Sequence, residues 1–446
     1  MSGISFAFEE SVRLSADEAG PVLPSNLRVP TETCAVTVKD FWAHLPTRSY
    51  VYTPTGETWT AASVDSRLGR VGNLSASKFL DRTRSVEQMT WAPGEPEIIK
   101  GRYIREGGWI MHSGARCLNL YRPPSLELGD ARRVQPWLDH ICKVYPEDSD
   151  QIIMWVAHRV QKPQEKINHA LVIGGRQGIG KDTIFEPVKQ AVGPWNFAEV
   201  GPHNVLGRFN PWVKSVIIRV SEARDLGDTD RYAFYERIKT LTAAPPDTLR
   251  VDEKNLREYS IPNLTGVIMT TNQVDGVFLP AEDRRHYVAW SDLTKEDFPF
   301  GYWNDLYAWL AGEGAANVAT YLSRVDLSGF DPKSPPRRTE AWQRIVDSGR
   351  APEDADLADI IEILGEPNAL TLAQLSDIAT SDFRRWLDDR RNRRVIPHRL
   401  QTAGYVPVRN DVAKDGMWKI RGRRQVVYAR HQLSLADRLA AARNLT

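Results

Sequence analysis

Short aliphatic runs alternate with amphipathic segments through the middle of the chain. Three of these runs, residues 170–173, 215–220 and 266–271, are rich in Val, Ile and Leu. Strands that are apolar on both faces are typical of a parallel sheet that helices cover on both sides. The pattern therefore predicts an α/β domain with a parallel central sheet, which we place at residues 166–325.

Two segments before this domain have apolar residues at helical spacing. They cover residues 131–144 and 148–160, and Pro163 ends the second. A repeat of three to four residues indicates helices that bury one face. We therefore expect a helical connector at residues 126–165.

The start of the chain has a different pattern. Residues 31–125 are rich in aromatic and turn residues, as in 49–59 and 107–111, which is typical of short strands joined by tight turns. We expect a small α+β accessory domain there. Residues 1–30 show no sustained periodicity, which favours a flexible N-terminal arm.

The end of the chain begins with a Pro-rich stretch at 331–338, which predicts a linker over residues 326–340. Residues 341–446 then give two helices, a basic helix that ends at Pro397, and a strand pair. The pair comprises Met417–Ile420 and Gln425–Tyr428, with a turn at Gly422. This order predicts a winged-helix-like DNA-binding domain.

Composition sets the class of protein. A chain of 446 residues exceeds the size of one hydrophobic core, and its content of 41% hydrophobic and 26% charged residues is that of ordinary globular domains. No apolar run approaches the roughly 20 residues of a membrane-spanning helix, and the N-terminus lacks the pattern of a secretory signal. We expect a cytoplasmic protein with no membrane partner.

The three cysteines, Cys34, Cys117 and Cys142, are far apart and have no partner at metal-ligand spacing. They predict neither a disulfide framework nor a zinc site, and they fit a reducing compartment.

Charge is distributed unevenly. The formal net charge is +1, but the segment from Arg384 to Arg424 contains 13 Lys or Arg against 4 Asp or Glu. A local excess of nine positive charges favours binding to a polyanion. We name five arginines of this tail as DNA-binding candidates: Arg390, Arg391, Arg393, Arg394 and Arg423.

A phosphate-binding motif directly follows the first aliphatic run. Residues 174–183 read Gly-Gly-Arg-Gln-Gly-Ile-Gly-Lys-Asp-Thr, with the glycine spacing and the Lys of a P-loop. The glycines let backbone N–H groups turn toward phosphates, and the Lys supplies a positive point charge. The expected nucleotide-binding residues are Gly175, Arg176, Gln177, Gly178, Ile179, Gly180, Lys181, Asp182 and Thr183.

ATP and Mg²⁺ are the expected cofactors, although the loop departs from the usual pattern at one position. Asp182 occupies the slot where Ser or Thr usually binds Mg²⁺. Either Thr183 supplies the hydroxyl, or the metal is held differently.

The other two aliphatic runs end in polar residues. Run 215–220 leads into Ser221 and Glu222, and run 266–271 leads into Asn272. Glu222 is the candidate to orient the attacking water and to help hold Mg²⁺, while Ser221 stands where a second acid is common. Asn272 lies where ligands of open α/β sheets gather, and is a candidate γ-phosphate sensor.

Arg284 and Arg285 follow Asp283 just before a further apolar run. An arginine at this place is suited to act on the nucleotide of a neighbouring subunit, where it would stabilise transition-state charge.

These motifs together resemble superfamily 3 helicases of the phage and prophage branch, like the helicase portion of phage primase-polymerases. The matching elements are the loop, the strand that ends in Glu222, the region from Lys239 to Asn255, Thr-Thr-Asn at 270–272, and Asp-Arg-Arg at 283–285. The likeness covers residues 30 to 310.

The resemblance implies an AAA+ type P-loop ATPase that forms a hexameric-type ring and moves 3′ to 5′ along single-stranded or forked DNA. By position, the resemblance implies that Lys181 and Thr183 bind nucleotide and Mg²⁺ and that Glu222 serves hydrolysis. It also implies that Asn272 acts as the sensor and that Arg284 or Arg285 acts as the arginine finger. It also places Lys254 on a β-hairpin that points into the ring channel.

Three functions stay open at this point. The leading hypothesis is a replicative DNA helicase or translocase of a phage or mobile element. The second is an origin-melting initiator or helicase loader that hydrolyses ATP slowly. The third is a DNA-binding scaffold whose P-loop holds nucleotide only to order the oligomer. Residues 1–125 contain no paired-acid motif that would hold two catalytic metals, so a primase or polymerase would come from another chain.

Overall fold

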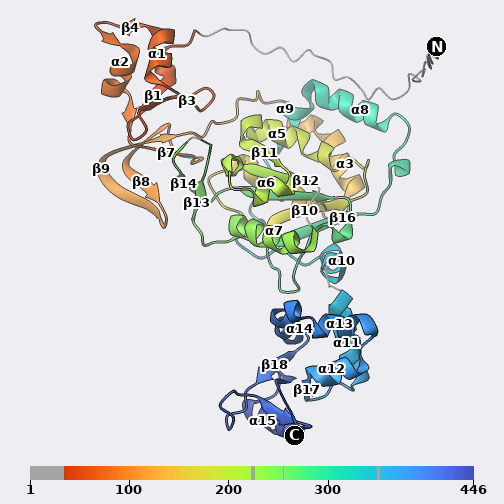
Figure 1. The fold of residues 1–446 in the computed structure, drawn as a ribbon. Coiled ribbons are helices and arrows are strands. Elements are labelled where there is room, and N and C mark those ends of the chain that lie inside the picture. The colour runs from red at the N-terminus through yellow and green to blue at the C-terminus, as the bar shows by residue number, and fades with distance from the viewer. Residues whose placement is uncertain (1–34, 222–226, 255, 349–351, 446) are drawn as a thin grey trace, which may run out of the picture. The chain divides into compact units, whose positions relative to one another are not determined.

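The structure is a computed structural model, and it describes residues 35–221, 227–254, 256–348 and 352–445 (Figure 1). The chain divides into two compact units between Ser85 and Val86. Each unit has its own hydrophobic core.

The first unit is a small α+β fold. Its antiparallel strands are β1 (Phe41–His44), β2 (Ser49–Tyr52) and β3 (Glu57–Trp59). The helices α1 (Ala61–Leu68) and α2 (Ala76–Thr83) frame the short pair β4 (Arg70–Val71) and β5 (Leu74–Ser75), and β6 (Ser85–Val86) follows. Side-chain oxygens of Thr60 and Ser75 accept from backbone N–H groups in the first turns of the two helices. The core packs these helices on the sheet through Phe41, Ala43, Tyr50, Val64, Ala76 and Leu80.

The second unit opens with a three-stranded sheet of β7 (Gln88–Thr90), β8 (Ile98–Arg105) and β9 (Gly108–Asn119). The amide of Asn119 closes it by bonding to Ala92 and Glu95 backbone atoms. The compact first unit therefore ends 40 residues before residue 125, where we placed the end of the accessory domain, because Trp91 and its neighbours pack with the larger unit.

The predicted connector contains α3 (Gln135–Val144) and α4 (Ser149–Gln161). The central sheet follows and is parallel throughout, in the order β11 (Phe197–Val200), β12 (Ile217–Ser221), β15 (Gly266–Thr271), β10 (Ala170–Gly175) and β16 (His286–Ser291). The predicted parallel sheet is confirmed. Strand β11 is short and half exposed, and its pattern did not distinguish it from a loop.

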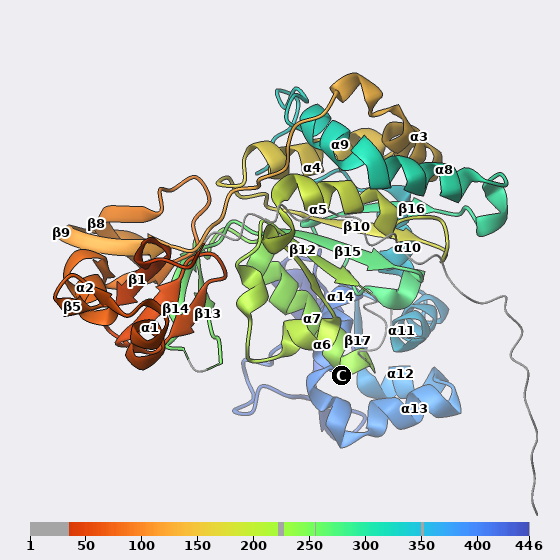
Figure 2. The ribbon, with the colours of Figure 1, turned by 90° about the horizontal axis from the view of Figure 1, so that it is seen from above.

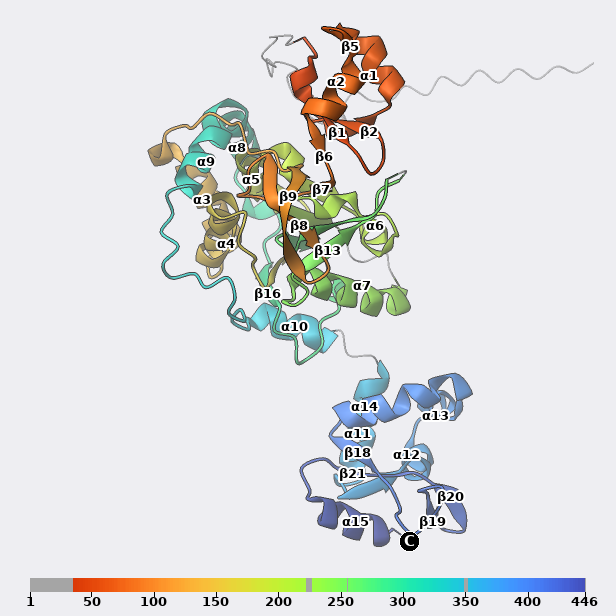
Figure 3. The same cartoon turned by 90° about the vertical axis from the view of Figure 1, so that its left-hand side faces the viewer.

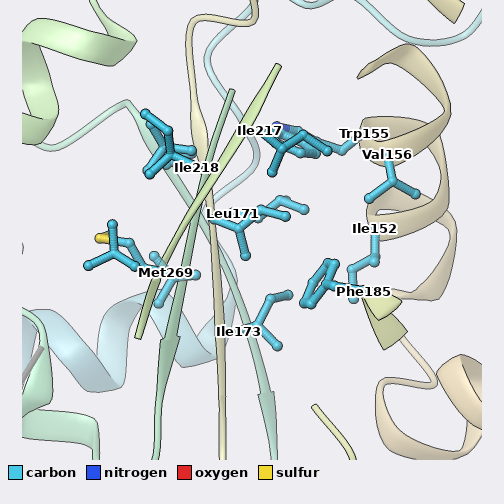
Figure 4. Packing of buried hydrophobic residues seen from close by; sticks show 14 of the residues in the cluster. Ile152, Trp155, Val156, Leu171, Ile173, Phe185, Ile217, Ile218 and Met269 are labelled. Carbon is cyan, nitrogen blue, oxygen red and sulfur yellow. The ribbon is translucent and has the colours of Figure 1, made fainter. Parts of the chain in front are cut away.

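Helices cover both faces of this sheet. In Figure 2, α3, α4, α5 (Glu186–Val192), α8 (Tyr302–Trp309) and α9 (Ala315–Leu322) lie over one face, and α6 (Pro202–Leu206) and α7 (Gly227–Thr242) lie over the other. Figure 4 shows Ile152 and Trp155 of α4 packed toward Leu171 and Ile173 of β10. Burial on both faces explains why these strands are aliphatic along their length.

Between β12 and β15 in the sequence, β13 (Thr248–Val251) and β14 (Tyr259–Pro262) form an antiparallel hairpin. After the sheet, residues 328–339 are irregular, and then α10 (Glu340–Ser348) packs against β16. Trp342 and Ile345 of α10 join the main core. The helix at 340–348 thus packs with the α/β fold, although we assigned residues 341 onward to the C-terminal domain.

The described residues of the C-terminal part form two sheets and five α-helices, which are drawn in blue in Figure 3. Strands β17 (Ala369–Thr371), β21 (Val427–Arg430) and β18 (Tyr405–Val408) form one antiparallel sheet, with β21 in the centre. Strands β19 (Trp418–Ile420) and β20 (Arg423–Gln425) form a hairpin. The helices are α11 (Pro352–Ile363), α12 (Leu372–Ile378), α13 (Ser381–Asp388), α14 (Ile396–Thr402) and α15 (Leu435–Arg443).

Two expectations for this part were wrong in detail. The segment Gln425–Tyr428 is not one strand, because Gln425 ends the hairpin while Val427 and Tyr428 pair with β17 and β18. Pro397 does not end a basic helix but lies in the first turn of α14, where a missing N–H costs no hydrogen bond. The turn at Gly422 is present, and Arg421 and Gly422 both have positive φ, as a tight hairpin turn requires.

Within the described residues, the structure has no helix that is both long and apolar enough to cross a bilayer.

One buried group predicts how stability depends on pH. His169 lies buried before β10, and neither ring nitrogen has a hydrogen-bond partner among the described residues. Burial, and then the charge of His286, lower the pKa of His169 to about 4. Below pH 6.5 the unfolded chain therefore binds a proton that the folded chain refuses, so stability falls as pH falls toward 4.

We expect His169→Met to remove this dependence, at a cost of less than about 1.5 kcal/mol at neutral pH because no hydrogen bond is lost. The free energy of unfolding of the wild type should drop by about 2 kcal/mol more than that of the variant between pH 7.5 and pH 5. Urea denaturation at both pH values measures this difference. The exposed His203→Gln is the matched control, and equal pH slopes in all three proteins would contradict the assignment.

Candidate functional site

The glycine-rich loop leaves the sheet at the carboxyl end of β10. There Gly174 lies level with Thr271 of β15, and Gly175 with Ser291 of β16. Ser221, the last residue of β12, lies level with Thr270. The loop, Ser221 and Asn272 therefore meet at one edge of the sheet, which is where open α/β folds bind ligands.

The loop is tightly packed at Gly180, which has a φ of +77°. A Cβ at this position would lie 2.7 Å from the ring of His140 and 2.7 Å from Trp303. Both the backbone conformation and the space exclude a larger residue. The glycine spacing in the sequence thus has a local physical cause.

Lys181 is buried, with 6% of its surface exposed, and all its hydrogen bonds stay within the site. Its ammonium donates to the carbonyls of Gly175 and Arg176, each at 2.8 Å, and to Oδ1 of Asn272 at 2.7 Å. Burial lowers the pKa of Lys181, and the neighbouring Asp182 carboxylate opposes this shift. The loop lysine and the predicted sensor therefore lie in direct contact.

Three side chains from the α3 region hold the loop from outside. Trp137 Nε1 donates to the carbonyl of Ile184 at 2.9 Å, and the Tyr145 hydroxyl donates to that of Gly174 at 3.0 Å. His140 Nε2 lies 3.0 Å from the carbonyl oxygen of Gly180. Our sequence interpretation treated this region only as a connector, because aromatic residues at helical spacing look the same in a core helix and in one that supports a site.

His140 also joins the loop to α8. A carbonyl only accepts, so Nε2 carries the proton, and Nδ1 then accepts from the Tyr302 hydroxyl at 2.9 Å. Burial lowers the pKa of His140, which favours this neutral form. Its ring also packs against Phe298 and Trp303. Loop and helix are thereby fixed to each other.

Asp182 and Thr183 face different surroundings. The Asp182 carboxylate, whose side chain is 64% exposed, lies 3.3 Å from Nη1 of Arg219 on β12. Arg219 in turn pairs with Glu199 at 2.9 Å. The Thr183 side chain is buried, and its hydroxyl lies 3.2 Å from that of Tyr307 on α8. Both oxygen groups therefore lie beside the loop, one exposed and one covered.

Glu222, the residue predicted to orient the attacking water, lies outside the described residues. Ser221 is described and is half-buried at the end of β12.

Arg284 and Arg285 lie far from the loop of their own chain. They precede His286, which pairs with Ala170, whereas the loop begins at Gly175, level with Ser291. His286 and Ser291 are five residues apart on β16, which corresponds to about 16 Å along the strand. Arg284 is exposed and Arg285 half-buried.

Asp283 fixes the turn that presents these two arginines. Its buried carboxylate accepts from the backbone N–H groups of Arg285 and His286, at 3.1 Å each, and from the Tyr235 hydroxyl at 3.0 Å. Burial alone would raise the pKa of Asp283, but His286 and these hydrogen bonds outweigh it and lower the pKa.

Lys254 lies exposed in the turn of the β13–β14 hairpin. The two acids beside it are both engaged, since Arg208 pairs with Asp252 at 2.9 Å and Lys214 pairs with Glu253 at 2.7 Å. The neighbouring negative charges are thus balanced within the hairpin region, and the Lys254 charge faces solvent.

The basic tail residues are divided among several elements. Arg390 and Arg393 are exposed on a 3₁₀ turn before α14, while the side chains of Arg391 and Arg394 lie outside the described residues. Arg423 is exposed on β20, and it lines one cleft together with Arg393, Asp377 and Asp388.

The chain is similar in part of its sequence to a family of unknown function and to a phage primase-polymerase. Residues 172–285 match a family described only as a family of unknown function (DUF5906). A stretch of 181 residues is 23% identical to the DNA primase-polymerase of Nitratiruptor phage NrS-1, covering 39% of this chain and 25% of that protein. The chain thus matches a quarter of the length of this curated relative.

The fold is similar to the C-terminal region of NrS-1. One apo structure of that region has a TM-score of 0.58 at 15% identity, covering 87% of this chain and 95% of the other. A second apo structure gives 0.56 at 15% identity, with 87% and 96% covered. The expected likeness to a phage primase-polymerase therefore holds as a similarity of fold.

The packing around Gly180 yields a prediction about binding. In Gly180→Ala the new methyl group must displace His140 or Trp303, which would move the loop carbonyls. We expect affinity for a fluorescent ATP analogue to fall at least about tenfold, the equivalent of about 1.4 kcal/mol. Equilibrium fluorescence titration measures it.

Gly301→Ala is the matched control, because Gly301 also has positive φ but has no atom within 4 Å of a Cβ. Its affinity should stay close to that of the wild type. Unchanged affinity in folded Gly180→Ala would show that the loop does not bind nucleotide.

Proposed function

We propose that the chain is an ATP-dependent DNA helicase or translocase of a phage or mobile element, with a P-loop ATPase core of the AAA+ type. The observation that carries this proposal is the contact between Lys181 Nζ and Asn272 Oδ1 at 2.7 Å. It joins a phosphate loop to a polar strand end at the carboxyl edge of a parallel sheet. In such sites the lysine binds phosphates and the amide detects the γ-phosphate.

The residues present fit ATP with Mg²⁺. Lys181 offers a buried cation for the phosphates, and the loop from Gly175 to Gly180 offers backbone N–H groups. Asp182, Thr183 and Ser221 carry oxygen groups of the kind that Mg²⁺ prefers. When bound, the metal would neutralise charge that develops on the phosphates. Glu222 would orient the water that attacks the γ-phosphate.

In this proposal, hydrolysis uses an arginine finger from a neighbouring subunit. Arg284 and Arg285 lie about 16 Å along the strand from Gly175. In the proposed ring, the arginines of one subunit reach the nucleotide of the next, and Asp283 holds their turn in place.

Two parts of the chain supply DNA contacts in this proposal. Lys254, at the hairpin turn, would contact the backbone of single-stranded or forked DNA in the channel. The C-terminal part would bind as a winged helix, because its helices α11 to α14, with β17 after α11, are followed by β18, the β19–β20 hairpin and β21. Arg390, Arg391, Arg393, Arg394 and Arg423 would then bind phosphates, which makes affinity fall steeply with salt.

The proposed organisation keeps the ATPase in residues 166–325 and the DNA-binding domain after the linker at 326–340. The protein would act in the cytoplasm of a bacterial host.

A slower ATPase, acting as an origin-melting initiator or helicase loader, is the second candidate. Ser221 favours it, since the strand end lacks the acid that commonly assists Mg²⁺ there. A scaffold that only binds nucleotide is the third. Turnover with and without single-stranded DNA separates the three: strong stimulation identifies a motor, weak turnover a loader and none a scaffold.

Removing the loop lysine should abolish hydrolysis. In Lys181→Ala we expect DNA-stimulated ATP turnover to fall on the order of 100-fold or more, because the loss of one preorganised charge at the phosphates has this scale. Phosphate release in steady state is the measurement. The control is Lys189→Ala, a half-buried lysine on α5 that pairs with Glu199. Intact turnover in Lys181→Ala would place the active site elsewhere.

The arginines can be tested by mixing subunits. Arg284→Ala and Arg285→Ala should each bind ATP normally, and the finger variant should lose about 10³-fold or more in turnover. Mixed with Lys181→Ala, which supplies intact arginines, the finger variant should regain measurable turnover at shared interfaces. No recovery in any mixture would count against action between subunits.

A further inference from the structure

The site departs from the usual phosphate-site pattern at two positions, one in the loop and one at the end of β12. Asp182 follows the loop lysine, where a hydroxyl residue is usual, and Ser221 ends β12, where an acid is common. Each position carries the type of group expected at the other.

The ion pair of Asp182 draws its carboxylate toward β12. Its partner Arg219 belongs to that strand, two residues before Ser221. Residues two apart on a strand point to the same face, and they are about 7 Å apart along it. The Asp182 carboxylate therefore lies beside the strand face that Ser221 shares.

The Asp182 carboxylate also keeps its oxygens available. Its contact with Arg219, at 3.3 Å, lacks hydrogen-bond geometry, because Nη1 and Nε of Arg219 have no hydrogen-bond partner among the described residues. The other charged partner of Arg219 is Glu199, whose Oε1 lies 2.9 Å from Nη2 of the arginine. The arginine is thus anchored by Glu199, and it holds Asp182 by charge alone.

Thr183 is a weaker metal ligand than its position suggests. Its side chain is buried, and its hydroxyl is 3.2 Å from the Tyr307 hydroxyl. A metal ion could reach this hydroxyl only if Tyr307 on α8 moved away. The Asp182 carboxylate is accessible without such a movement, because its side chain is 64% exposed.

We propose that the two positions have exchanged roles: Asp182 supplies the Mg²⁺-binding carboxylate that is common at the position of Ser221, and Ser221 supplies the hydroxyl that is usual at the position of Asp182. Arg219 positions Asp182 for this task. The inference rests on the proposed ATPase function, and it assigns the metal carboxylate to the loop rather than to the strand. A carboxylate and a hydroxyl are both hard oxygen ligands, so the pair provides the same donor set from exchanged positions.

The test measures metal binding apart from turnover. Mn²⁺ replaces Mg²⁺, and the electron paramagnetic resonance signal of free Mn²⁺ reports its binding to protein saturated with a non-hydrolysable ATP analogue. Asp182→Asn should weaken Mn²⁺ binding at least about tenfold. In EDTA the same variant should bind the nucleotide as well as the wild type or better, because a negative charge near the phosphates is gone.

The exchange makes a stronger prediction. Asp182→Ser alone should lose Mn²⁺ affinity, and the double variant Asp182→Ser with Ser221→Asp should recover it to within about threefold of the wild type. Glu199→Gln, which removes the other partner of Arg219, is the control and should change Mn²⁺ affinity less than Asp182→Asn does.

The outcomes separate the two proposals. A wild type that binds neither nucleotide nor Mn²⁺ overturns the ATPase function itself. A wild type that binds both, with Mn²⁺ affinity unchanged in Asp182→Asn, overturns the exchange and leaves the ion pair a structural one. A parallel loss of nucleotide affinity in EDTA and of Mn²⁺ affinity would also overturn it, because that result indicates a distorted loop.

Discussion

A buried ammonium group needs acceptors on its accessible sides, and the arrangement of the site depends on how Lys181 finds them. Two acceptors are carbonyls of its own loop and the third is Asn272 on the adjacent strand. An unpaired charge would cost several kcal/mol at this depth. Satisfying Lys181 therefore fixes the curvature of the loop and ties it to β15 at the same time.

The sheet makes this contact possible by its register. Because β10 and β15 are parallel neighbours with Gly174 level with Thr271, the residues that follow them emerge side by side. The α3 region then holds the loop from outside through Trp137, His140 and Tyr145. The loop is thus supported from the strand side and the helix side, which explains why Gly180 has no room for a side chain.

The periodicity of the sequence was sufficient to predict the parallel sheet, its three central strands and the loop, since each rests on a local pattern: aliphatic runs, glycine spacing and a lysine. It was not sufficient for contacts that arise only on folding. The role of His140 depends on a carbonyl 40 residues away, and the pairing of Asp182 with Arg219 depends on how two strands and a loop are stacked. In the C-terminal part, the interruption between strands β20 and β21 at Val426 also depends on tertiary pairing. Gln425 pairs within the hairpin, whereas Val427 pairs with Val408 of β18 in the three-stranded sheet.

In the proposed function, the two ends of β16 serve two different nucleotide sites. Ser291 at one end lies beside the loop, and His286 at the other end follows the two arginines whose turn Asp283 holds. A strand is too stiff to bring its own ends together, and Arg285 is held by its backbone bond to Asp283. In the proposed function, a complete hydrolytic site would then require a second copy of the chain, and oligomer formation would be part of the chemistry. Neighbouring subunits would be coupled in that arrangement, because each nucleotide would be bound by one subunit and its site completed by an arginine of the next.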